Sequence, residues 1–369
     1  MFKAKLGDPG LGSLGPSRAG RLLFSGLALA GMLMVTACAP LKEAQDGAKK
    51  KPIQTVWPEP PDEARFQYKW RLRSAADLEP PVELKNVLKG LGEKASDQPA
   101  FTRPAGIAAR NGLIYVADSQ GQGVVVFDVP RRKVFKFGQR EPNTLEKPMA
   151  VALDAKGQVY VLDVKRKKVM VFDPLGLYQF EVGDPAILAR PASVAVNREG
   201  TRIYIVDRGS TDGDDHRVLA YNEKGERLFD IGPRGRGEGQ FNIPLDATVD
   251  ADGTLYVVDS GNFRVQLFSP EGKFRMAFGG PGNRLGQFSR PRGVAVGADG
   301  NIYVTDAVYN NVQIFNSQGE LLMPLGKVDI DKDLPGNYGL IAGVAVDEKN
   351  HLYVVDQYFN KVEIFSRLE

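Results

Sequence analysis

Cysteine and histidine are scarce in this chain of 369 residues, and their scarcity excludes several kinds of site. Cys38 is the only cysteine, so the chain forms no intrachain disulfide and carries no haem attachment motif. His216 and His351 are the only histidines and lie far apart in the sequence. Shared metal sites need several such ligands at close spacing. We therefore expect neither a cofactor nor a bound metal.

Long hydrophobic runs are also missing. The apolar run from Leu22 to Val35 is too short for a convincing membrane span. It follows four basic residues and leads into the small residues Thr36 and Ala37. This order is typical of an N-terminal targeting signal that is later removed. We assign residues 1–37 to such a signal.

The sequence Val35-Thr36-Ala37-Cys38 resembles the lipobox of bacterial lipoproteins. The resemblance implies that the signal is cut before Cys38, which then carries lipid and anchors the chain in a membrane. Residue 39 is alanine rather than aspartate, and in that family this implies the outer membrane of the cell envelope. A free or buried structural cysteine is the alternative for Cys38.

No excess of positive charge remains once residues 1–37 are removed. The whole chain has 48 Lys+Arg and 45 Asp+Glu, and the signal holds four and one of these, which leaves 44 of each. Binding of nucleic acid depends on a continuous basic face. A neutral chain therefore gives no reason to expect a nucleic-acid partner.

The rest of the chain repeats one pattern, which is clearest from Val249 to Phe268. There two β-rich runs flank the turn Asp250 to Gly253, and further runs follow after short loops. A tyrosine three residues before an aspartate marks six copies, spaced by 45, 44, 52, 47 and 50 residues. The six aspartates are Asp118, Asp163, Asp207, Asp259, Asp306 and Asp356. A period of this size, made of four short strands, indicates a β-propeller blade.

The six copies predict an all-β fold, a six-bladed β-propeller of four-stranded antiparallel blades over residues 100–369. One sheet cannot bury both of its faces, so the blades must pack against one another in a closed ring. The sixth copy lacks a fourth strand, whereas Phe66 to Arg73 alternates apolar and polar residues. We expect this N-terminal strand to pair with Val362 to Phe365 and close the last blade. The alternative is a strand that packs elsewhere.

Two segments precede the ring. Residues 38–64 are rich in proline and predict an extended tether. Residues 65–99 hold the closing strand and a short helix, expected over Val82 to Ser96 from leucines at helical spacing.

The pattern Pro-x-Gly-Val-Ala-Val, turn, Ile-Tyr-Val-x-Asp, loop, Val-Gln-x-Phe resembles the NHL repeat, most closely over Arg290 to Phe315. The resemblance implies a propeller but little about function, because propellers host many unrelated activities. The peptide-amidating lyase, whose propeller is similar, uses histidines at a central metal. By the repeat register His216 and His351 fall on opposite faces, so that catalytic set has no match here.

Loops after the second strand of each blade lie on one face in propellers of this type, around the mouth of the central channel. In this chain they hold a basic loop and several aromatic and amide residues, which suit recognition of a protein or glycan surface. The alternative is that the aromatic rings pack on adjacent loops. The candidate partner-binding residues in these loops are Lys165, Arg166, Lys167, Lys168, Tyr309, Asn310, Tyr358 and Phe359.

The acidic residues divide into three groups. The six repeated aspartates suit a structural role, in which each carboxylate accepts N–H bonds from a loop. Asp246 differs, because it stands where the other copies carry Gly, Ala or Ser. It either points into the channel mouth, as a further candidate partner-binding residue, or caps its strand. Two acidic loops leave cation binding open: Asp212, Asp214 and Asp215 in one, and Asp329, Asp331 and Asp333 in the other.

These observations together favour a binding module over an enzyme. We expect a lipid-anchored propeller that acts as a protein-binding or scaffolding module in the bacterial cell envelope, with an envelope protein or glycan as partner. The alternative is a periplasmic lyase or hydrolase that acts on a glycan or peptide in the channel mouth.

Overall fold

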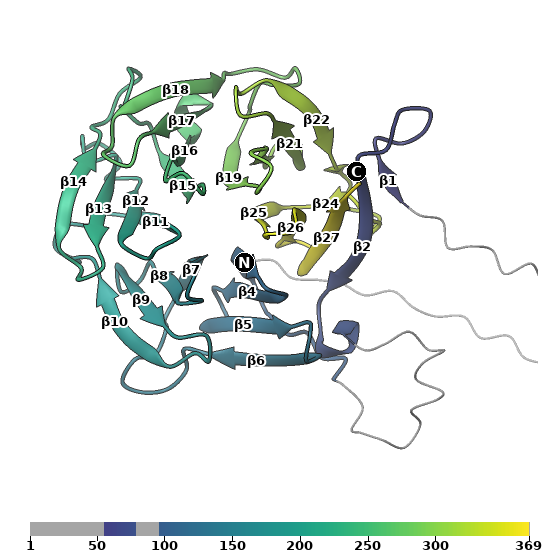
Figure 1. The fold of residues 1–369 in the computed structure, drawn as a ribbon, viewed down its shortest axis with the longest axis horizontal. Helices are drawn as coiled ribbons and strands as arrows, with labels where there is room; N and C mark the ends of the chain where they lie inside the picture. The colour runs from purple at the N-terminus through teal and green to yellow at the C-terminus, as the bar shows by residue number, and fades with distance from the viewer. Residues whose placement is uncertain (1–54, 79–95, 369) are drawn as a thin grey trace, which may run out of the picture. The chain divides into compact units, whose positions relative to one another are not determined.

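The computed structural model describes residues 55–78 and 96–368. These residues form six antiparallel sheets, here called blades one to six, which surround a central channel (Figure 1). The first strand of each blade lines the channel, and the last lies at the perimeter (Figure 1). The all-β, six-bladed fold predicted from the repeat is thereby confirmed.

Blades one to five each contain four strands in the order of the sequence. From the channel outward, blade one contains β3 (Pro104–Arg110), β4 (Leu113–Asp118), β5 (Gly123–Asp128) and β6 (Lys133–Phe137), and blade two contains β7 (Pro148–Leu153), β8 (Val159–Asp163), β9 (Lys168–Phe172) and β10 (Tyr178–Val182). Blade three contains β11 (Pro191–Val196), β12 (Arg202–Asp207), β13 (Arg217–Asn222) and β14 (Arg227–Ile231), and blade four contains β15 (Pro244–Val249), β16 (Leu255–Asp259), β17 (Arg264–Phe268) and β18 (Phe274–Gly279). Blade five contains β19 (Pro291–Val296), β20 (Ile302–Asp306), β21 (Asn311–Phe315) and β22 (Leu321–Leu325).

Blade six is completed by the N-terminal part of the described chain. Its own strands are β25 (Ile341–Val346), β26 (His351–Asp356) and β27 (Lys361–Arg367), and β2 (Phe66–Leu72) pairs antiparallel with β27. The register places Phe66 opposite Arg367 and Leu72 opposite Val362. The predicted closure of the last blade by an N-terminal strand is confirmed.

A fifth strand extends blade six beyond the closing strand. β1 (Val56–Trp57) pairs with β2, although these residues were expected to belong to an extended tether. The ring of Trp57 packs edge-on against Phe365, with 5.2 Å between the ring centroids. This aromatic contact gives the segment a fixed place on the sheet.

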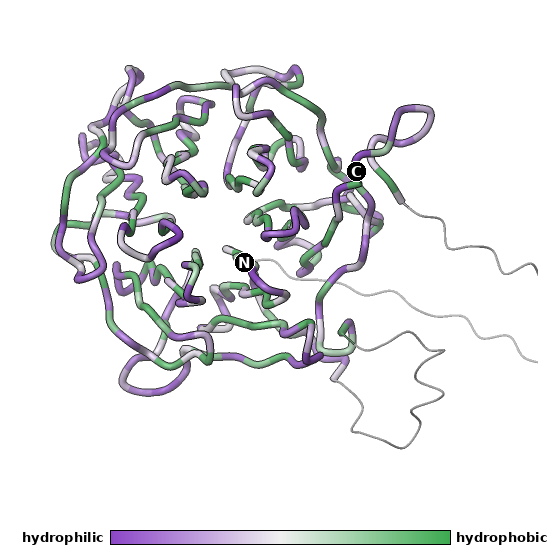
Figure 2. The backbone as a smooth tube through the Cα atoms, in the orientation of Figure 1, coloured by the Kyte–Doolittle hydropathy of each residue, from purple (hydrophilic) through white to green (hydrophobic). Residues whose placement is uncertain are grey.

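The hydrophobic core lies between the blades rather than within one of them. Each of six buried clusters combines side chains from two adjacent blades, and the cluster between blades six and one includes Leu72 of the closing strand. Hydrophobic residues follow the strands of every blade (Figure 2). The middle strands are covered by neighbouring blades on both faces, and β5, β8 and β20 are therefore buried along their whole length.

Four short elements lie outside the blades: the 3-10 helices η1 (Ala75–Leu78) and η2 (Ser260–Asn262), and the paired strands β23 (Lys327–Val328) and β24 (Asn337–Tyr338). The signal, Cys38, residues 38–54 of the tether and residues 82–95 of the expected helix lie outside the described residues. Over residues 55–78 and 96–368, no helix has the length and apolar character needed to cross a membrane.

Candidate functional site

One end of the central channel is defined by the repeated aspartates. In each blade the first residue of the innermost strand pairs with the aspartate that ends the second strand, as Pro104 does with Asp118 and Ile341 with Asp356. All six innermost strands therefore begin at the same end of the channel, here called the mouth. The loops that follow the six aspartates surround this mouth.

The repeated aspartates are buried and hold these loops in place. In blade one, Asp118 Oδ1 accepts bonds from the backbone N–H groups of Arg103, at 2.8 Å, and Gly121, at 3.0 Å. The other five aspartates also accept backbone N–H bonds from residues of the mouth loops. Six equivalent carboxylates whose lone pairs are occupied in this way serve structure, as the sequence predicted.

The basic loop of blade two is largely neutralised by acidic neighbours. Lys165 Nζ lies 2.6 Å from Glu146 Oε2, and the guanidinium of Arg166 lies 3.5 Å from the other oxygen of Glu146. Lys168 forms an ion pair with Glu181. Lys167 is half-buried with a left-handed backbone. Within this loop, Lys165 remains the most exposed candidate for contact with a partner.

The candidate residues of blade five are tied to the scaffold. The hydroxyl of Tyr309 donates a hydrogen bond to the backbone carbonyl of Gly282, at 2.8 Å. Asn310 is buried, and its side-chain oxygen accepts a bond from the N–H of Ile341 in blade six, at 3.0 Å. Asn310 therefore joins two blades at the start of an innermost strand.

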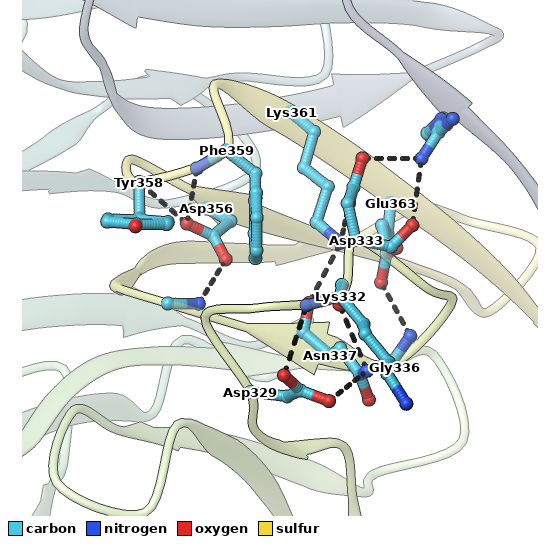
Figure 3. A network of polar contacts seen from close by, with 12 residues as sticks. Asp329, Lys332, Asp333, Gly336, Asn337, Asp356, Tyr358, Phe359, Lys361 and Glu363 are labelled. Carbon is cyan, nitrogen blue, oxygen red and sulfur yellow. Dashed lines mark hydrogen bonds and ion pairs between the residues drawn. The ribbon is translucent and has the colours of Figure 1, made fainter.

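Of the two aromatic candidates in blade six, Tyr358 is exposed and Phe359 is half-buried. Tyr358 and Phe359 lie side by side in the loop held by Asp356 (Figure 3), with 5.0 Å between the ring centroids. Tyr358 is 56% exposed as a residue, which makes it the most exposed aromatic residue in the mouth loops. The Phe359 ring covers the ammonium group of Lys361, which lies 5.2 Å from the ring centroid.

Asp246 lies on the channel wall and links three blades. Its carboxylate, on β15 of blade four, accepts a 2.5 Å bond from the hydroxyl of Ser193 in blade three and a 2.9 Å bond from the N–H of Val294 in blade five. Burial raises the pKa of Asp246 to about 6, although these hydrogen bonds and the nearby Arg292 favour the charged form. The sequence anticipated a channel-facing or strand-capping carboxylate but not this link between blades.

The channel is a cavity of about 590 Å³, and its mouth carries basic side chains that sequence reasoning missed. Lys147, Arg208 and Arg292 line the cavity. Basic residues also occupy the position before the proline that opens the first strand in four copies: Arg103, Lys147, Arg190 and Arg290. That recurrence in the sequence was the signal that could have revealed them.

The acidic loop of blade six is part of the scaffold. Asp333 contacts Arg71 and Arg73 of the N-terminal segment and lies 3.0 Å from Lys361 Nζ (Figure 3). Asp329 accepts a 2.9 Å bond from the side chain of Asn337. Asp333 is thus surrounded by three cationic groups rather than by further carboxylates.

The remaining metal-ligating residues are also dispersed. In blade three, Asp215 accepts bonds from Ser210. His216 is buried and accepts a 3.1 Å bond from the N–H of Ile243, while His351 contacts Asp347, which follows β25 at the opposite end of the channel. No group of three or more His, Cys, Asp or Glu side chains in the described part of the chain is arranged to hold a metal.

The family model of the NHL repeat matches residues 241–268 and 288–315. Each match contains the first three strands of one blade, β15 to β17 and β19 to β21. The chain contains NHL repeats. The resemblance noted from the sequence is confirmed for these two blades of the propeller.

Known proteins that resemble this NHL propeller differ widely. Over 131 residues, or 34% of this chain, it is 29% identical to Protein brain tumor of Drosophila melanogaster, and the match spans only 12% of that protein. A protein of unknown function from Bacteroides thetaiotaomicron is similar in structure, with a TM-score of 0.58, 17% identity, and coverage of 75% of this chain and 72% of that chain. A gluconolactonase from Xanthomonas campestris has a TM-score of 0.54 and 18% identity, over 73% of this chain and 87% of its own. At such identities the structural similarity establishes the fold alone.

Proposed function

We propose that this NHL propeller is a lipid-anchored binding or scaffolding module of the bacterial cell envelope. In this proposal Cys38 carries the lipid, the outer membrane is the destination, and the loops around the mouth contact an envelope protein or glycan. The sequence Val35-Thr36-Ala37-Cys38 supports the anchor, because an apolar run and small residues precede the thiol.

The exposed Tyr358 is the observation that carries the binding role. Tyr358 is an exposed tyrosine in a loop fixed by the Asp356 carboxylate, and it therefore offers a rigid aromatic anchor to a partner. Such anchors contribute strongly to protein interfaces because they bury a large apolar area at little cost in conformational entropy. The ammonium group of Lys165 adds an exposed polar contact in the equivalent loop of blade two.

A second candidate is an enzyme that works in the channel on a glycan or peptide. The carboxyl of Asp246, whose pKa burial raises to about 6, favours this candidate, because general acids and bases work best with a pKa near the ambient pH. Both of its oxygens accept hydrogen bonds from the protein, however, and no second carboxylate within residues 55–78 and 96–368 is hydrogen-bonded to it. The binding role therefore has the better support.

The binding role is tested by capture from crosslinked membranes. Tyr358→Ala and Lys165→Ala should each reduce the amount of one reproducible partner, whereas Leu175→Ala should not. Leu175 is 76% exposed but lies in the turn between β9 and β10, at the end of the blade away from the mouth. If both mouth variants retain every partner captured by the wild type, the proposed binding face is wrong.

The anchor is tested separately. A Cys38→Ser protein should leave the membrane fraction, because the thiol that would carry the lipid is gone. A Cys38→Ser protein that still partitions with membranes would contradict the lipoprotein assignment and leave the binding face to be judged on its own.

A further inference from the structure

Basic side chains gather around the mouth of the channel. Four of them directly precede the first strand of a blade, and these are Arg103, Lys147, Arg190 and Arg290. Arg292 lies in the first strand of blade five, and Arg208 lies in the loop after the second strand of blade three. Arg103, Lys147, Arg208 and Arg290 are exposed, and Arg190 and Arg292 are half-buried. Because the six innermost strands all begin at this end, the topology directs these residues to one opening.

None of the six basic side chains forms an ion pair with an acidic side chain in residues 55–78 and 96–368. Arg190 donates a 2.5 Å bond to the backbone carbonyl of Gly209, and Arg292 makes a long contact of 3.5 Å with the carbonyl of Ile341. The repeated aspartates of blades one, three and five accept the backbone N–H groups of Arg103, Arg190 and Arg290. Asp207 and Asp246 are the carboxylates whose charges attract Arg208 and Arg292. Within the described part of the chain, Asp207 and Asp246 therefore offset only part of the positive charge of the six basic groups, and neither forms an ion pair with them.

The basic groups at the mouth repel one another, and the two arginines that line the cavity, Arg208 and Arg292, feel this repulsion. Burial lowers the pKa of Arg292, and the neighbouring charges of Arg290 and Arg103 lower it further, while attraction to Asp246 opposes them. Burial likewise lowers the pKa of Arg208, with repulsion from Arg190 exceeding attraction to Asp207. Like charges that outnumber their counter-charges destabilise one another, and a bound anion relieves that repulsion.

We propose that the mouth of the channel binds a small organic anion with at least two carboxylate or phosphate groups. Arg208 and Arg292 line the cavity and would contact the ligand from blades three and five. Guanidinium groups bind carboxylate and phosphate oxygens through paired N–H donors. This site goes beyond the proposed role of the outer loops, because it lies at the centre of the mouth and needs neither Tyr358 nor Lys165.

The size and boundary of the charged region favour a small ligand over a polymer. The cavity of about 590 Å³ falls in the range of sites for small molecules. Among the loops that surround the mouth, the basic loop of blade two is neutralised by Glu146 and Glu181. A polyanionic chain needs a basic groove that continues along its backbone, and the neutralised loop interrupts any such groove.

Calorimetric titration of the full-length protein in detergent tests this site. Citrate and pyrophosphate serve as the multiply charged probes, one with carboxylate groups and the other with phosphate groups. Glucuronate and glucose serve as a second pair, in which the first carries one negative charge and the second carries none. We expect citrate or pyrophosphate to bind with a Kd below about 1 mM at low salt and more weakly at high salt. Glucose should give no binding heat, and glucuronate should bind more weakly than the multiply charged probes.

Two variants and one control locate the site. Arg208→Met and Arg292→Met should each weaken anion binding by about tenfold, whereas Arg198→Met should leave it unchanged. Arg198 also lines the channel but follows β11 at the end opposite to the mouth. Arg208 is exposed, so its substitution tests the site even if Arg292→Met fails to fold.

Three results would overturn the proposal. The first is that no anion gives binding heat, and the second is that Arg198→Met weakens anion binding as much as Arg208→Met does. The third is that single-stranded DNA binds tightly and is not displaced by citrate or pyrophosphate. A loss of membrane partners in Tyr358→Ala with unchanged anion binding would support the outer loops and leave the central site intact.

Discussion

The carboxylate of Asp246 in blade four lies 2.5 Å from the hydroxyl of Ser193 in blade three. Its second oxygen accepts the N–H of Val294 in blade five. One side chain thus connects three consecutive blades at the channel wall. Among the described residues, no other carboxylate of an innermost strand makes such a link. The link places a titratable group inside the ring.

Asp246 should make the stability of the propeller depend on pH. In the unfolded chain an aspartate ionises near pH 4, whereas burial raises the pKa of folded Asp246 to about 6. Between these values the folded state holds a proton that the unfolded state has lost, so the free energy of unfolding falls as pH rises through this window. Denaturant unfolding of wild type and Asp246→Asn at several pH values measures the effect.

The difference in the free energy of unfolding between the wild type and Asp246→Asn should change with pH in one direction. The stability of the wild type relative to Asp246→Asn should be greater at pH about 4.5 than at pH about 7.5, by roughly 1–3 kcal/mol. Other titrating groups are shared by both proteins and cancel in the difference. A difference between the two proteins that stays constant across pH would show that Asp246 is not perturbed by the channel.

Leu72 tests whether the N-terminal strand is part of the ring. Its side chain is fully buried between blades six and one, so Leu72→Ala should lower the free energy of unfolding by about 2–5 kcal/mol. Leu285→Ala, at a side chain that is 61% exposed, should change it by less than about 0.5 kcal/mol. Equal and small effects in denaturant unfolding would mean that β2 does not complete blade six.

Lys361 tests the buried charges beside the closing strand. Its ammonium group is fully buried and lies 2.7 Å from Glu363, which is also buried (Figure 3). Lys361→Met leaves the Glu363 carboxylate without its partner and should cost about 3–5 kcal/mol in denaturant unfolding. The exposed Lys327 makes a matched control, and Lys327→Met should be nearly neutral.

A double variant separates the pair from the packing around it. Lys361→Met combined with Glu363→Gln should be less destabilised than the sum of the two single variants, because no unpaired charge then remains buried. Additive effects would contradict a direct interaction between Lys361 and Glu363.

The fold could be predicted because its determinants repeat along the sequence. Each Tyr-x-x-Asp copy marks the end of a second strand, and the alternation of Phe66 to Arg73 marks a strand without a partner in its own segment. The pairing of Val56 and Trp57 with β2 was missed, since two residues carry no periodicity. Their contact with Phe365 depends on an end of the chain that lies more than 300 residues away.

The site was harder to predict because its chemistry depends on contacts between distant residues. The loop from Lys165 to Lys168 is strongly basic in the sequence, but Glu146 and Glu181 neutralise it in the structure. Asn310 is polar and lies in a loop, yet it is buried against Ile341 of the next blade. The mouth arginines stand singly in the sequence and come together only when the ring closes.

The binding face at the mouth is tested most directly by site-specific photo-crosslinking in intact cells. A protein with Tyr358→benzoylphenylalanine should form a discrete crosslinked product, because residue 358 is exposed in a fixed loop at the mouth. The same substitution at Leu175, which is exposed in the turn away from the mouth, should form none. A product at Leu175 but not at Tyr358 would contradict the account.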